Sequence, residues 1–213
     1  MSNPHDISFM EVGAGLNDMS ILKKTEEILE KHGNELKYKN QFILLKAKNP
    51  DKPTVDKNKK QNPFSNPNTE DFYVMSSSDY NILADQFNRE KVTLTEGKVY
   101  VNSYDFVIMG AKDEYIFINN EYLNLIINGE LNRFKLSGEA IGGAVNVDRS
   151  RTNIAVVSDA DFEKLKANTP QEEQIMYYGY NVKDWQKSAD AVKEISSIVP
   201  KNDNIYFTEK LVL

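Results

Sequence analysis

FYVMSSSDYNIL at residues 72–83 has a counterpart later in the chain, IAVVSDADFEKL at residues 154–165. In both copies an apolar run stops at a Ser-x-x-Asp motif and apolar residues then continue at helical spacing. The serine hydroxyl of such a capping box accepts an amide hydrogen of the first helical turn, and the acidic side chain reaches back to the cap amide. Each copy therefore predicts a strand that runs into a helix, and the pair predicts two related α/β lobes.

The first 48 residues predict a β-α-β unit. Residues 6–12 alternate as in a strand, and a helix capped by Asn17 or Asp18 follows. Gly33 supplies a left-handed stop, and residues 36–48 return as a strand. The apolar face of the helix has helical spacing and consists of Ile21, Leu22, Thr25, Ile28 and Leu29.

The middle of the chain is expected to be largely antiparallel. Residues 92–109 predict two or three short strands with a turn at Glu96-Gly97. Asn128-Gly129 lies between two apolar runs, and both residues accept the positive φ of a type I′ hairpin turn. Residues 138–150 form a glycine-rich stretch that predicts turns.

The last part of the chain predicts a strand at 176–180, a helix capped by Asn181, and a final strand at 204–213. The inner face of that helix is expected to consist of Trp185, Ala189, Val192, Ile195 and Val199. Both chain ends are thus expected to be strands. If they pair with each other, the domain would hang from two adjacent stalks.

These elements predict an α+β fold with mixed, largely antiparallel sheets and a few packed helices. We expect one domain of three segments: a β-α-β unit with a Lys/Pro-rich loop (1–70), the first repeat copy with the hairpin region (71–150), and the second copy with the C-terminal helix and exit strand (151–213). A length of 213 residues fits this organisation.

The composition restricts the classes of function. The chain has no cysteine, which excludes disulfides, zinc–thiolate sites and thiol catalysis. It has no apolar stretch near 18 residues and no signal peptide, so it is expected to be either a cytosolic protein or a soluble piece excised from a larger one. The abrupt end at Leu213, inside an expected strand, favours the excised piece.

Charge is distributed unevenly along the chain. Residues 37–60 hold eight lysines against two aspartates, a local charge of +6 in a chain of net charge −6, which leaves −12 for the remainder. The net charge argues against a nucleic-acid partner. A Pro/Lys-rich loop at 49–69 overlaps this region and is expected to be exposed and mobile. Its candidate contact residues for a charged partner or ligand are Lys52, Lys57, Lys59 and Lys60.

Few residue patterns suggest catalysis or a cofactor. There is no phosphate-binding Gly-x-x-x-x-Gly-Lys motif, and Gly142-Gly143 lacks the strand-turn-helix context of a dinucleotide site. The stretch 148–151 could form a small anion site or a mixed-charge surface turn. The only histidines, His5 and His32, are too few for a multi-histidine metal site. No nucleophile, base and oxyanion donor assemble, so a non-enzymatic protein without a cofactor is expected.

Several of these stretches together resemble the large extracellular domain of BceB-type permeases, the antimicrobial-peptide ABC transporters of the FtsX-like superfamily. Residues 3–9 are similar to the segment that follows a membrane helix in that family, and residues 27–33 are similar to its first helix. The best match is residues 74–84 followed by 92–99. The high lysine and asparagine content is similar to that of VraG-like permeases from low-GC Gram-positive bacteria.

The resemblance covers the first half of the chain and implies a role but no functional residue. It implies a domain on the extracellular face of the cell membrane, excised from a multi-pass permease. It implies partnership with a cytoplasmic ATPase subunit and with a membrane histidine kinase. The ligand would be an antimicrobial peptide, such as bacitracin, nisin or a cationic host peptide, or a lipid-bound cell wall precursor.

Two alternatives stay open at this point. One is the extracellular domain of another FtsX-like exporter, for example one for lipoproteins or toxins. The other is a free-standing cytosolic α/β enzyme, adaptor or binding protein. Apolar segments directly before and after the chain would favour the permease.

Overall fold

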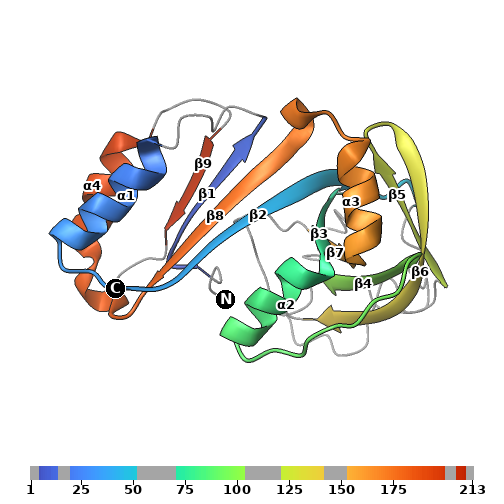
Figure 1. The fold of residues 1–213 in the computed structure, drawn as a ribbon, viewed down its shortest axis with the longest axis horizontal. Helices are drawn as coiled ribbons and strands as arrows, with labels where there is room; N and C mark the ends of the chain where they lie inside the picture. Colours follow the sequence, from blue (N-terminus) through green and yellow to red (C-terminus); the bar gives the residue numbers. More distant parts are fainter. Residues whose placement is uncertain are drawn as a thin grey trace, which may run out of the picture. The chain divides into compact units, whose positions relative to one another are not determined.

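The computed structural model describes residues 5–13, 20–51, 71–103, 121–141, 153–199 and 205–209. They form an α+β fold that divides into two compact units (Figure 1). The first unit takes residues from both ends of the chain, 1–44 and 171–213, together with 147–149. The second unit comprises 45–146 and 150–170. The α+β class expected from the sequence is confirmed, while the three-segment division stays a prediction.

The first unit is a sheet with two helices on one face (Figure 1). Strand β1 lies between β8 and β9 and is antiparallel to both, so that Phe9 is opposite Tyr178 on one side and Phe207 on the other. In spatial order, the strands are β2 (Leu36–Lys48), β8 (Gln174–Val182), β1 (Ile7–Val12) and β9 (Ile205–Glu209).

The helices of this unit are α1 (Ser20–Lys31) and α4 (Ala189–Ile198). All five residues of the predicted α1 face are buried, and they pack with Ile7, Phe9 and Tyr180 of the sheet. Removing each such large apolar side chain from water contributes roughly 1.5–3 kcal/mol. Gly33 has a φ of +68° and its amide donates to the Glu30 carbonyl at 2.9 Å, which confirms the predicted stop.

The strand pairings of the second unit close into a ring. The end of β2 pairs with β3, where Leu45 is opposite Val74, and also with β5, where Lys48 is opposite Ile126. The ring continues from β3 through β7, β4 and β6 to β5. Its remaining strands are β3 (Asp71–Ser76), β4 (Lys98–Ser103), β5 (Tyr122–Ile127), β6 (Glu130–Ile141) and β7 (Asn153–Val157).

Both copies of the repeat lie in this second unit, side by side. Strands β3 and β7 pair in parallel and lead into α2 (Ser77–Gln86) and α3 (Asp159–Ala167). The hydroxyl oxygens of Ser76 and Ser158 each accept the predicted amide hydrogen three residues later, both at 3.1 Å. The caps are therefore confirmed, but the repeat does not relate the two units. β7 is buried at all five positions, and a strand apolar on both faces suits parallel pairing inside one sheet.

Strand β2 belongs to both units, and its burial pattern changes where it passes from one to the other. Asn40, Phe42 and Leu44 are buried at alternate positions, and then Leu45 and Ala47 are buried at the opposite alternation. Since side chains alternate between the faces of a strand, the buried face changes at Leu44–Leu45. The predicted bounds of this strand, 36–48, are confirmed.

Several local predictions are wrong. Residues 92–95, which the structure describes, form no strand before the turn at Glu96-Gly97. The predicted inner face of the last helix is only partly right, because Ala189 is exposed and Trp185 lies outside α4.

Asn181 does not cap a helix, because β8 continues to Val182, whose amide donates to the Asp6 carboxylate at 3.0 Å. Ser188 precedes α4 instead, after the short 3-10 helix η3 (Trp185–Lys187). Turns were also predicted from residue 138 onward, but β6 continues through Gly138 to Ile141.

The glycine in β6 has a packing role. A Cβ atom at Gly138 would lie 3.1 Å from the Tyr100 ring, so the missing side chain allows the ring to cover the strand. A register shift between Val99 and Tyr100 accompanies this approach.

Candidate functional site

The first and last strands lie next to each other in the first unit. β1 and β9 are antiparallel, with Ile7 opposite Glu209 and Glu11 opposite Ile205. Facing Cα atoms in such a pair are about 4.5–5.5 Å apart. The start of β1 therefore lies beside the end of β9, so the chain enters and leaves this sheet at the same place. The strands expected near both ends are confirmed, and the pairing that the sequence left open is present.

A buried polar cluster lies at the start of β1. His5 is 0% exposed, and its ring lies against the aromatic side chain of Tyr177. Its Nδ1 atom is 2.6 Å from the Tyr177 hydroxyl, and its Nε2 atom is 2.7 Å from the Asn40 Nδ2 atom. We call His5, Asn40, Tyr177 and Gly179 the His5 cluster. It joins the start of the chain to β2 and β8.

The hydrogen bonds of the cluster assign the tautomer of His5. The Asn40 amide nitrogen can only donate, so the His5 Nε2 atom accepts and Nδ1 carries the proton that is donated to Tyr177. Burial lowers the pKa of His5 from 6.5 to about 3. The ring is therefore neutral at neutral pH, and its donor and acceptor both have partners.

Gly179 makes room for this ring. A Cβ atom at that position would lie 2.3–2.4 Å from three atoms of the His5 imidazole. Directly beside it, Phe42 stacks on Tyr177 with ring centroids 6.1 Å apart. The signal in the sequence was the single glycine within Tyr177-Tyr178-Gly179-Tyr180, because a glycine inside a strand often marks a close approach.

Asp6 attaches the same end of the chain to β8 through its backbone and its side chain. Its amide donates to the Tyr180 carbonyl at 2.9 Å, and its carboxylate accepts the Val182 amide at 3.0 Å. Together with the His5 cluster, these bonds fix the first residues of the described chain to the centre of the sheet.

The second unit has a different polar site, at the N-termini of α2 and α3. The Asp159 carboxylate accepts from the Ser78 amide and the Ser77 hydroxyl, both at 2.9 Å, and from the Ser78 hydroxyl. These bonds, those from Ser78 foremost, lower the pKa of Asp159. A helix N-terminus attracts anions, and here a side chain of the protein already supplies the anion. The site is therefore structural.

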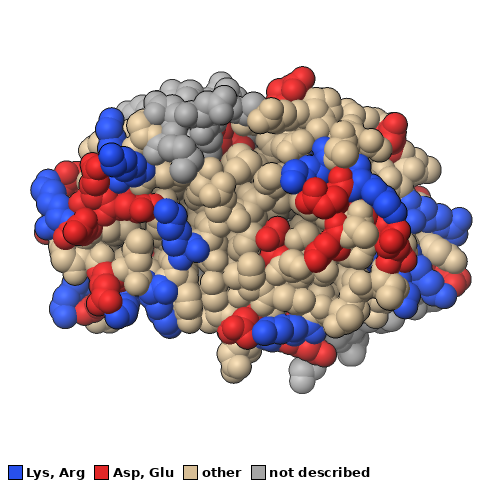
Figure 2. Space-filling model, in the orientation of Figure 1, with Lys and Arg blue, Asp and Glu red and all other residues tan. Residues whose placement is uncertain are grey.

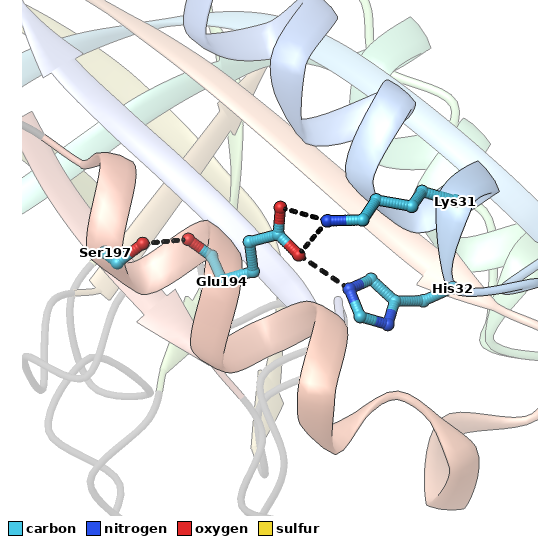
Figure 3. A network of polar contacts seen from close by, with 4 residues as sticks. All are labelled: Lys31, His32, Glu194 and Ser197. Atoms are coloured by element: carbon cyan, nitrogen blue, oxygen red, sulfur yellow. Dashed lines mark hydrogen bonds and ion pairs between the residues drawn. The ribbon is translucent and has the colours of Figure 1, made fainter.

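A third polar group joins α1 to α4 in the first unit. The Glu194 carboxylate accepts from Lys31 at 2.8 and 2.9 Å and lies 2.7 Å from the His32 Nε2 atom (Figure 3). The bonds from Lys31 and then His32 lower the pKa of Glu194. Figure 2 shows cationic and acidic side chains interspersed over these helices. This surface is therefore mixed in sign rather than uniformly acidic.

The predicted contact residues Lys52, Lys57, Lys59 and Lys60 lie outside the described residues, as do Gly142-Gly143 and 148–151. Within the described ranges, no three His, Cys, Asp or Glu side chains are grouped so that they could hold a metal ion. No helix in these ranges is long and apolar enough to span a bilayer.

No protein-family model matches the chain. A stretch of 146 residues, 65% of this chain, is 23% identical to the ABC transporter permease YvcS of Bacillus subtilis strain 168. This chain is similar to part of an ABC transporter permease. It spans only about a fifth (21%) of the length of YvcS. The similarity therefore concerns one portion of the larger permease.

Two solved structures are similar over almost the whole chain. A lipoprotein from Bacillus anthracis aligns over 95% of this chain and 98% of its own, with 13% identity and a TM-score of 0.45. The periplasmic region of MacB from Actinobacillus actinomycetemcomitans aligns over 96% and 88%, with 14% identity and a TM-score of 0.34. Both TM-scores are below 0.5, so neither similarity bears on function.

Proposed function

We propose that this chain is the extracellular domain of a BceB-type ABC transporter permease, most similar to VraG-like members, that acts in antimicrobial peptide resistance and sensing. The observation that carries the proposal is the pairing of β1 with β9, which brings residues 7 and 209 to opposite positions. A domain inserted between two membrane helices must receive and return the chain on one side. Adjacent terminal strands satisfy this requirement.

The similarity to YvcS supports the same conclusion from the sequence. The aligned stretch is 21% of that permease, which is the proportion expected of one domain within a much larger membrane protein. In this proposal, ATP hydrolysis belongs to a separate cytoplasmic ATPase subunit. The domain itself acts by binding and not by catalysis.

The proposed ligand is an antimicrobial peptide or a lipid-bound cell wall precursor, and the proposed signalling partner is a membrane histidine kinase. Lys52, Lys57, Lys59 and Lys60 are the proposed contact residues. A run of lysines would attract the phosphates of a lipid-bound precursor and repel a cationic peptide.

A deletion in the full-length permease tests the proposal. Because Ile7 is opposite Glu209, a short Gly-Ser turn can replace residues 7–209 without separating the flanking segments. We expect the shortened permease to insert and to bind its ATPase, but to lose resistance to bacitracin, nisin and cationic peptides and to lose peptide-induced signalling. Resistance and signalling at the level of the intact permease would overturn the proposal.

Charge reversal tests the contact residues separately. Lys57→Glu, Lys59→Glu and Lys60→Glu together should reduce resistance or signalling in the intact permease. The matched control is the reversal of three exposed lysines on the helices of the first unit, Lys23, Lys24 and Lys193. If both triple variants behave like the parent, Lys57, Lys59 and Lys60 are not contact residues. The deletion experiment would still decide whether the domain as a whole is needed for resistance and signalling.

A further inference from the structure

The outward face of the β5–β6 hairpin combines exposed apolar side chains with a cation that forms no ion pair to any residue that the structure describes. The strands pair so that Ile126 is opposite Leu131 and Tyr122 is opposite Lys135. The alternate side chains point into the core, where Leu123, Leu125, Ile127 and Phe134 are buried. The hairpin face, as we define it, consists of Tyr122, Asn124, Ile126, Leu131, Arg133 and Lys135. Asn124 donates to the Asp51 carboxylate at 2.7 Å.

Ile126 and Leu131 form the apolar part of this face. Leu131 is 65% exposed and Ile126 is 36% exposed. Among the described residues, the large hydrophobic side chains with such exposure are these two and Ile82 of α2. Since Ile126 and Leu131 lie directly across from each other, their exposed surfaces are continuous. A single exposed leucine needs no explanation, but a continuous cross-strand apolar pair can anchor a partner.

Arg133 supplies the polar part of the face. Its guanidinium lies 3.9 Å from the centroid of the Tyr122 ring, and it forms no ion pair within the described part of the chain. Lys135, by contrast, is paired with Glu121 at 3.3 Å. Stacking on an aromatic ring restrains the guanidinium and leaves its N–H groups free for a carboxylate. The Arg133 guanidinium, rather than the net charge of the face, therefore favours an acidic group on the partner.

The hairpin is held in place, which favours a protein partner over a bilayer. Asn128 and Gly129 have φ values of +46° and +76°, as a type I′ turn requires, which confirms the predicted turn. The Asn128 side chain donates to the Asn168 carbonyl at the end of α3 at 2.8 Å, so the tip is attached to the rest of the unit. The polar tip also carries Glu130, which is unsuited to insertion into lipid.

We propose that the hairpin face is a docking surface for a protein segment that places apolar side chains on Ile126 and Leu131 and a carboxylate on Arg133. The surface is formed before binding, so little ordering would oppose association. The proposal goes beyond the proposed function and does not depend on it.

The test is photocrosslinking in cells that make the full-length protein, with a benzophenone amino acid at position 131. We expect a crosslink to a partner segment that contains apolar residues and an aspartate or glutamate. Arg133→Glu should reduce the crosslink at least tenfold, and replacing the partner's acidic residue with arginine should restore it. Crosslinks only to lipid or to a second copy of this chain, or none at all, would overturn the proposal.

Matched variants separate docking from folding. Ile126→Thr keeps a β-branched residue in the strand and should weaken the crosslink, while Ile82→Ser removes an exposed isoleucine from α2 and should leave it unchanged. Each variant must retain the unfolding midpoint of the parent chain. The purified chain should not sediment with phosphatidylcholine–phosphatidylglycerol vesicles. Sedimentation that is lost when Leu131 is replaced would identify a lipid surface instead and overturn the proposal.

Discussion

The two histidines of the chain lie in the same unit but in opposite surroundings. His5 is 0% exposed, and its ring nitrogens bond to the neutral side chains of Tyr177 and Asn40. The His32 side chain is 26% exposed, and its Nε2 atom lies 2.7 Å from the Glu194 carboxylate, which also binds Lys31. One histidine is part of the interior, while the other belongs to a surface ion-pair group.

This difference shows that the partners of a histidine decide what it does. A buried ring with neutral partners must remain uncharged, so it contributes to stability only while the solution leaves it unprotonated. The partly buried His32 ring lies beside a carboxylate that also pairs with Lys31, and water and salt screen such a surface ion pair. Changes around His5 should therefore have large effects and changes around His32 small ones.

The largest effect is expected from Gly179→Ala. The new Cβ would overlap the His5 ring, which must move and break its bonds to Asn40 and Tyr177. Overpacking combined with lost buried hydrogen bonds should lower the free energy of unfolding by about 3 kcal/mol. Urea denaturation of the isolated chain measures this change.

A double-mutant cycle assigns the effect to the ring. In a His5→Ala background the space is free, so Gly179→Ala should cost at least about 1 kcal/mol less than it does in the parent chain. An equal cost in both backgrounds would show that Gly179 is needed for another reason.

A smaller effect is expected from pH. The pKa of His5 is about 3 in the folded chain and 6.5 when unperturbed, so between these values the unfolded chain binds one more proton. Stability is fully present above about pH 6.5 and is lost as the pH falls toward 3. Between about pH 7.5 and about pH 5.5 the loss due to His5 should be about 1.4 kcal/mol.

The control for the pH experiment is His5→Gln, which cannot titrate at this position. The difference in unfolding free energy between parent and variant should shrink as the pH is lowered, because all other titratable groups are the same in both chains. A difference that is the same at both pH values would mean that His5 is not a buried neutral ring.

The smallest effect is expected from Glu194→Gln. This change removes the ion pair to Lys31 and alters the contact with His32 between α1 and α4 (Figure 3). The lowered pKa of Glu194 means that its contribution is present at neutral pH and is lost as the pH falls through the folded-state pKa. Urea unfolding should reveal only a slight loss, which added salt abolishes.

Lys193→Gln is the comparison for Glu194→Gln, since it lies on the same helix and is exposed. It should have no salt-dependent effect. A loss for Glu194→Gln as large as that for Gly179→Ala would contradict the contrast between the two histidines.

Local patterns in the sequence predicted the elements whose signals are local. The α1 face, the type I′ turn and the two serine caps each depend on residues within one or two turns of chain, and all three are confirmed. The bounds of β2 could also be predicted, because its apolar residues lie between the turn at Gly33 and the Asn49-Pro50 pair.

The His5 cluster could not be predicted in this way, because its partners are distant in sequence. Asn40 is 35 positions from His5 and Tyr177 is 172 positions away. The error at Asn181 has a similar origin. Asparagine is a common helix cap, but at this position pairing with the distant β1 and the bond from Val182 to Asp6 extend the strand instead. Side-by-side placement of the two repeat copies likewise depends on strand pairing and not on the repeat itself.

The interleaving of the two units has a consequence for the order in which the chain can fold. Every described strand of the second unit lies between residues 45 and 157, so its ring can form while β8, α4 and β9 are still being synthesised. β1 cannot complete its pairing until residue 209 has emerged. During synthesis, β1 therefore remains incompletely paired until β9 has been made. Premature termination anywhere before β9 would leave one edge of β1 unpaired and open to association with other chains.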